Sequence, residues 1–255
     1  MKRTILLCMT VFLCFLMFSA CTENAEPVTL PCRVIAVIGD ELLLASEGRE
    51  PIMTLLPAKN PKITLLRDGI PTGADDAPTA GDFLYLTYED GMLDTTPSVP
   101  RGVTQMDIVS DDYDNLSAVY LSVLSDFAKE EEMHFDGLSM LAVSLEETEL
   151  PLWEQTAVVY AIARQYPTLT VIADSREDLK AKGFMTKEPD SIRWHWEGGA
   201  FLTVSENPRK CTDQTRVFNA NFNSGFSHGW TNCKTTRDTD SGIWSPYDIG
   251  GMVHG

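Results

Sequence analysis

The chain has 255 residues, of which 44% are hydrophobic, and a formal net charge of -17. This length suffices for one large or two small domains, and the composition is that of a globular protein rather than a disordered one. Because an acidic surface repels phosphate backbones and anionic lipid head groups, we expect no nucleic-acid partner.

The first twenty residues have the pattern of a secretory signal peptide. Lys2 and Arg3 give a positive start, and residues 5–20 are uncharged and mostly apolar. This run is shorter than the roughly 20 apolar residues that a membrane span needs. A single-span anchor is therefore the weaker alternative.

Cys21 follows a short stretch of small residues at the end of that signal. Ser19, Ala20 and Cys21 resemble the lipobox of bacterial lipoproteins, although Phe18 stands where leucine is usual. The alternative is a chance cysteine beside an ordinary signal. Two acyl chains such as palmitate on Cys21, at ~0.8 kcal/mol per buried methylene, would hold the protein to a bilayer. We therefore predict a signal peptide over 1–20, a lipid on Cys21 and a location on the extracytoplasmic face of the cell membrane.

A tether over residues 21–30 leads into a region of short apolar runs. Turns such as Gly39–Asp40 separate these runs, and residues 71–81 form a longer loop rich in Pro, Gly and Asp. Several short strands without a long helix favour a small antiparallel β-barrel over residues 31–110. The expected strands are 33–38, 41–45, 52–56, 63–66, 83–88 and 103–109.

The run GDFLYLTYEDGMLDTTPSVPRGVTQMDIV, residues 81–109, has a distinctive order of features. It resembles the closing half of the small β-barrel domain that opens many uncharacterised lipoproteins of Gram-positive gut bacteria. The turn over residues 88–91 is one residue longer than in that pattern. The resemblance implies a barrel like those that bind oligonucleotides or oligosaccharides, and it implies no activity.

Residues 111–255 show helical and strand periodicity in alternation, so we predict an α+β domain that follows the barrel, with a boundary near 110–116. Apolar residues at three- and four-residue spacing predict a helix over 116–127, capped by Asp114 or Asn115. Pro151 opens a second helix, and Ser175 with Asp178 forms a capping box for a third. The expected strands are 138–145, 169–173, 200–204, 216–222, 230–235 and 243–249.

Three cysteines remain once Cys21 carries lipid and the signal is removed. Cys211 and Cys233 lie in one β-rich stretch, so they are the expected disulfide pair, and Cys32 stands apart. The alternative is three buried free thiols.

The chain shows no catalytic motif. Its four histidines (His134, His195, His228 and His254) have no close metal-binding spacing. We predict no catalytic residue, metal ligand or cofactor. Residues 238–242 have some features of a calcium loop but fit a hairpin tip better.

Aromatic residues provide the candidate ligand site. Trp194, Trp196 and Trp230, with His228, could form a stacking surface for a sugar or a cationic ligand. The alternative is that these tryptophans belong to the core, since Trp194 and Trp196 would face the same side of a strand.

These features favour a membrane-anchored binding or interaction module whose partner is an envelope glycan or protein. The alternative is a cell-envelope hydrolase acting on glycan or peptide, with acidic residues and His195 or His228 as candidates. An exposed tryptophan groove would favour binding, and two facing carboxylates would favour glycoside hydrolysis.

Overall fold

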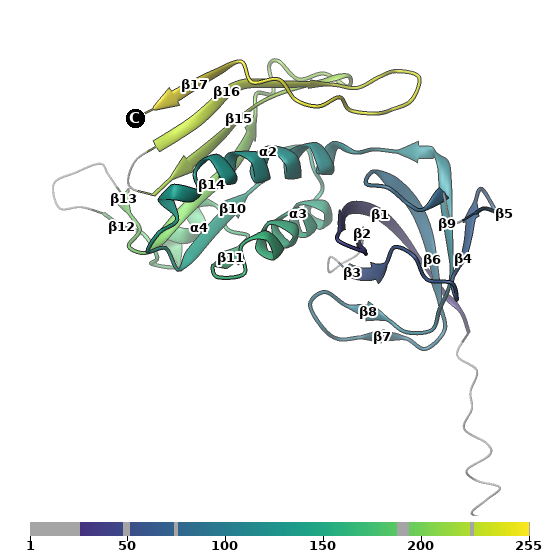
Figure 1. Ribbon diagram of the computed structural model, residues 1–255. Coiled ribbons are helices and arrows are strands. Elements are labelled where there is room, and N and C mark those ends of the chain that lie inside the picture. Colours follow the sequence, from purple (N-terminus) through teal and green to yellow (C-terminus); the bar gives the residue numbers. More distant parts are fainter. Residues whose placement is uncertain (1–25, 48–51, 74–75, 188–193, 225–226, 255) are drawn as a thin grey trace, which may run out of the picture.

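The computed structural model describes residues 26–47, 52–73, 76–187, 194–224 and 227–254. Two β-sheets lie at opposite ends of the molecule, and helices α2 and α3 lie between them (Figure 1). Strands hold 46% and helices 18% of the residues that the structure describes. The fold is therefore rich in β-structure with few helices, and the expected combination of a barrel with an α+β domain is wrong.

The first sheet has seven strands in the order β3-β2-β1-β6-β9-β4-β5, all antiparallel except the pair β4–β9. Beside it lies a small hairpin of β7 (Met92–Leu93) and β8 (Val99–Pro100). The sheet strands are β1 (Val28–Ile38), β2 (Glu41–Ser46), β3 (Ile52–Pro57), β4 (Thr64–Arg67), β5 (Ile70–Pro71), β6 (Asp82–Tyr88) and β9 (Val103–Tyr113).

This first sheet is open and does not close into a barrel, because its outer strands β3 and β5 do not pair with each other. Side chains are buried on both of its faces. In β2, Leu42 and Leu44 pack into one apolar cluster, whereas Leu43 and Ala45 pack into another that includes α2 and α3. A helix layer thus covers the face that would be outermost in a closed barrel.

The second sheet has six strands in the order β11-β10-β14-β15-β16-β17. Strand β10 is parallel to both of its neighbours, and the other pairs are antiparallel. A further short pair joins β12 (Thr186–Lys187) to β13 (Trp194–His195). The sheet strands are β10 (Met140–Ser144), β11 (Thr170–Ile172), β14 (Gly199–Glu206), β15 (Thr215–Asn223), β16 (Ser227–Thr236) and β17 (Gly251–His254).

Helices cover the two faces of this sheet unequally. One face packs against α2 (Leu116–Glu130) and α3 (Leu152–Gln165) and forms the main core. The short helix α4 (Arg176–Ala181) covers only one end of the opposite face, where Leu179 packs against Ala142. We call that opposite face, beyond α4, the free face.

The predicted helices agree with the structure. The apolar spacing of α2 buries Val123, Leu124 and Phe127, and the capping box at Ser175 and Asp178 forms as expected. The strand expected over 243–249 is wrong, because only isolated bridges form there and the last strand is β17.

Candidate functional site

Alternation along β15 gives the free face its polar character. Phe218, Ala220 and Phe222 are buried against the helices, whereas Asn221 and Asn223 project from the other side of the strand. An apolar layer and a row of amides thus share one strand. Asparagine is depleted in strands, so a row of amides on one face marks a candidate site for polar contacts.

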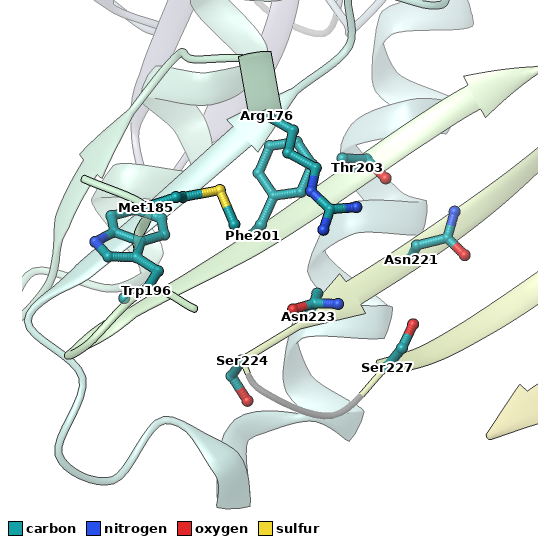
Figure 2. Close-up of a pocket in the computed structure, with 10 residues that line it drawn as sticks. Arg176, Met185, Trp196, Phe201, Thr203, Asn221, Asn223, Ser224 and Ser227 are labelled. Carbon is teal, nitrogen blue, oxygen red and sulfur yellow. The ribbon is translucent and has the colours of Figure 1, made fainter. Parts of the chain in front are cut away.

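A cavity of about 250 Å³ lies on the free face, over strands β14 to β16 (Figure 2). We call it the polar pocket. Arg176 extends from α4 over the strands, and Trp196 and Met185 lie on the other side of Phe201. The polar pocket is lined by Arg176, Met185, Trp196, Gly199, Phe201, Thr203, Asn221, Asn223, Ser224 and Ser227.

Trp196 forms the apolar wall of the polar pocket. Its indole lies directly against Gly199, where an added Cβ would overlap the ring. Leu179 and Met185 support it in a small separate cluster. The absence of a side chain at Gly199 therefore leaves room for the Trp196 ring, and the close packing restricts the motion of this ring.

Arg176, Thr203 and Asn221 form the polar side. Within the described residues, these three side chains make no hydrogen bond. Their donors and acceptors are therefore available to a ligand without breaking an internal contact.

A second, more acidic hollow of about 400 Å³ continues from the polar pocket along the free face. It shares Arg176, Phe201, Thr203 and Asn221 with the polar pocket. Glu146, Glu147 and Glu177 also line it. Among the described lining residues, Arg176 is the one ionisable side chain of the polar pocket, so a ligand longer than one ring or residue would extend from beside this guanidinium into an acidic hollow.

The four residues of the predicted aromatic site do not lie together in the structure. Trp196 borders the polar pocket, but it is only 8% exposed and belongs to a buried cluster, so the core interpretation applies to it as well. Trp194 is half-buried, with the ammonium of Lys180 5.3 Å from the centre of its ring. Trp230 is buried beside Phe127, with ring centres 4.7 Å apart. Trp230 is thus a core residue, as the alternative interpretation expected.

His228 lies on the helix face of β16, away from the polar pocket. Its Nδ1 is 2.9 Å from Oε1 of Glu131, at the end of α2. Its neighbour Ser227 lines the polar pocket on the free face. His228 therefore cannot act together with Trp196 on one ligand.

The predicted bridge between Cys211 and Cys233 is not formed, because both residues are free thiols. Cys211 belongs to the loop before β15, and its Sγ is 3.5 Å from the carbonyl oxygen of Val217. Cys233 is buried within β16, opposite Phe218 in the ladder. Cys32 is also a buried free thiol.

The acidic turn over residues 238–242, after β16, is closed by hydrogen bonds to the carboxylate of Asp238. Asp238 Oδ1 accepts hydrogen bonds from the backbone N–H groups of Asp240 and Ser241, at 3.1 and 2.8 Å. These bonds and that of the Ser241 hydroxyl lower the pKa of Asp238. The hairpin-tip interpretation therefore accounts for these residues.

Cys21 and the expected signal peptide lie outside the described residues. Among the described residues, no helix has the length and apolar character to cross a membrane. The lipid on Cys21 stays a prediction.

Sequence reasoning missed the amides and Arg176. The available indication was the alternation of asparagine with Phe or Ala over 218–223, which predicts a strand with one polar face.

No protein-family model matches the chain, and no curated protein or solved structure matches it either.

Proposed function

We propose that this protein is a lipid-anchored binding protein of the bacterial cell envelope, and that its polar pocket binds a segment of envelope glycan. The observation that carries the proposal is that Arg176, Thr203 and Asn221 line one side of the polar pocket, on one side of Phe201, with Met185 and Trp196 on the other. The membrane attachment through Cys21 and the extracytoplasmic location belong to the same proposal.

A glycan suits this combination of surfaces. A sugar ring carries hydroxyl groups around its rim and C–H groups on its faces, so it needs both hydrogen-bonding side chains and an apolar wall. Asn221 and Thr203 can donate to and accept from hydroxyl groups. Met185, Trp196 and Phe201 provide the apolar wall.

The composition of the polar pocket supports binding rather than hydrolysis. Among its described lining residues, none is Asp, Glu, His or Cys. Glycoside hydrolysis usually needs two carboxyl groups, about 5 to 10 Å apart, across the bond that is broken. The three glutamates line the acidic hollow and are absent from the described lining of the polar pocket.

Calorimetric titration of the full chain with soluble fragments of cell-wall glycan tests the proposal. We expect saturable binding, and Asn221→Ala should weaken it at least about tenfold, because a polar contact that is lost to a bound ligand costs roughly 1.5 kcal/mol. A loss of glycan over time would show hydrolysis instead.

Asn219→Ala is the control, since Asn219 lies on the same strand but does not line the polar pocket. Its Oδ1 accepts a hydrogen bond from the backbone N–H of Asn232 over 3.0 Å, so circular dichroism checks that this variant is folded. It should bind as the wild type does. Binding that is equally weak in both variants, or absent from the wild type, would contradict the proposed function.

A further inference from the structure

Three ionisable side chains from distant parts of the chain meet at the end of α2. Glu131 follows the last residue of α2, His134 ends the short 3₁₀ helix η2 (Glu132–His134), and His228 lies on β16. Glu131 Oε1 is 2.9 Å from Nδ1 of His228, and its Oε2 is 3.7 Å from Nε2 of His134. One ligand atom from each residue lies within 4.8 Å of the others.

The carboxylate of Glu131 is placed where a negative charge is unfavourable. Its side chain is only 4% exposed, and no hydrogen bond reaches its Oε2 within the described part of the chain. It also stands at the C-terminus of a helix, where the backbone dipole already concentrates negative charge, and Glu130 and Glu132 add more. A buried charge in such a position needs a positive partner.

A metal ion would supply positive charge to this carboxylate and would use one ligand atom from each of the three residues. Two histidines and one glutamate form the ligand set of several zinc sites, in which a water molecule takes the fourth position. The half-buried state of His134 and His228 leaves a path for an ion from solvent. Rotations of these side chains would shorten the present separations to the zinc bond lengths of about 2 Å.

His254 stands on another side of the cluster. It is the ladder partner of His228 on β17, and their ring centres are 4.7 Å apart. Three of the four histidines of this acidic chain thus gather in one place, although they are far apart in the sequence.

We infer that Glu131, His134 and His228 form a binding site for a divalent transition-metal ion, with zinc as the preferred class of ligand. The site lies on the helix face of the second sheet, and it is therefore independent of the polar pocket. An ion there would fix η2 and the end of α2 to strand β16.

Zinc titration of the full chain tests this inference. The protein is purified without a polyhistidine tag and stripped with a chelator, and zinc uptake is followed by calorimetry and by elemental analysis after dialysis. We expect one zinc ion per chain. Glu131→Gln and His228→Gln should each weaken binding at least about tenfold, an effect that even the loss of an outer-shell partner can have.

His195→Gln is the matched control, because His195 is an exposed histidine on β13 whose ladder partner is Thr186. It should take up zinc as the wild type does. His134→Gln changes a side chain that is 30% exposed, so it tests the site even if Glu131→Gln does not fold. No zinc uptake by the wild type, or unchanged uptake by the His134 and His228 variants, would overturn the inference and leave an ordinary ion pair.

Discussion

Glu154 shows how a single buried side chain can join three elements. It lies in α3, accepts a hydrogen bond from Ser117 of α2, and its Oε1 is 3.5 Å from Nε of Arg33 in β1. Burial raises the pKa of Glu154, and the contacts with Ser117 and Arg33 offset only part of that effect. The folded protein therefore favours the protonated form more than the unfolded chain does.

The sign of this shift gives a pH prediction. Because the folded pKa lies above the ordinary value of 4.5, the contribution of Glu154 to stability is complete below that value and is lost as the pH rises through the folded pKa. Urea unfolding from about pH 4 to about pH 7 should therefore show the wild type losing stability relative to Glu154→Gln. A difference that is constant or that changes in the opposite direction would refute this assignment.

The three free thiols should differ in reactivity. Burial raises the pKa of Cys32 to about 12 and that of Cys233 to about 11, so neither forms the reactive thiolate in the folded state. Burial raises the pKa of Cys211 as well, but this thiol is only half-buried and is therefore the most accessible of the three. Alkylation of the native protein, mapped by mass spectrometry, should label Cys211 first, and all three should react after unfolding. If Cys211 and Cys233 resist labelling in denaturant until a reductant is added, a disulfide joins them after all.

At the scale of elements, α2 is held to the second sheet by one buried polar contact and a row of apolar ones. The hydroxyl of Tyr120 donates to Glu206 Oε1 over 2.6 Å, and the Glu206 side chain is only 5% exposed. Tyr247 makes the comparable bond to Asp126, over 2.8 Å, at the surface. The two tyrosines form a natural pair for comparison.

Tyr120→Phe should lower the free energy of unfolding by about 2 kcal/mol, because a buried carboxylate loses a hydrogen-bond donor that water does not replace. Tyr247→Phe should lower it by less than about 1 kcal/mol, since water can reach Asp126. Thermal or urea unfolding of both variants checks the difference. Equal losses would mean that the burial of Glu206 does not matter.

Sequence patterns predicted the helices well, because the side chains that determine where a helix lies and begins are close together in the sequence. The spacing of Val123, Leu124 and Phe127 decides which side of α2 is buried, and Ser175 with Asp178 fixes the start of α4. The location of a tryptophan depends instead on distant partners. Trp230 and Trp196 gave similar patterns, but one packs on α2 and the other lines the polar pocket.

At the scale of the whole molecule, the barrel prediction was wrong because the first sheet is open and α3 covers one of its faces. The sequence indicates only that this sheet has a strand with two buried faces. The run Leu42 to Ala45 is continuously apolar, which is typical of a strand buried on both faces. The sequence does not show that α3 covers one of those faces. The same limit applies to Glu131, His134 and His228, whose meeting depends on how α2 packs on β16.

The two predicted domains share one apolar cluster. Ile35, Leu43 and Met53 of the first sheet belong to the same cluster as α2, α3 and the second sheet. We therefore expect the two regions to unfold together. All five tryptophans lie between residues 153 and 244, so their fluorescence reports only on the second region.

Hydrogen exchange of the β1 and β6 amides reports on the first region and allows the comparison. Both probes should give the same urea midpoint. Loss of protection in the first sheet at clearly lower urea would instead show that the two regions are independent, with a boundary near residues 110–116.

Strands β15 and β16 follow α2 in the chain only after α3 and β14, and this order has a consequence for biogenesis. Tyr120 packs on Phe218 and Phe127 on Trp230, so part of the apolar side of α2 stays uncovered until β15 and β16 have been synthesised and have left the ribosome. During that interval, the nascent chain presents a sticky helical surface that attracts chaperones and other nascent chains. A premature stop codon just before β15 would remove three of the six strands of the second sheet, and it would leave this part of α2 uncovered in every product molecule.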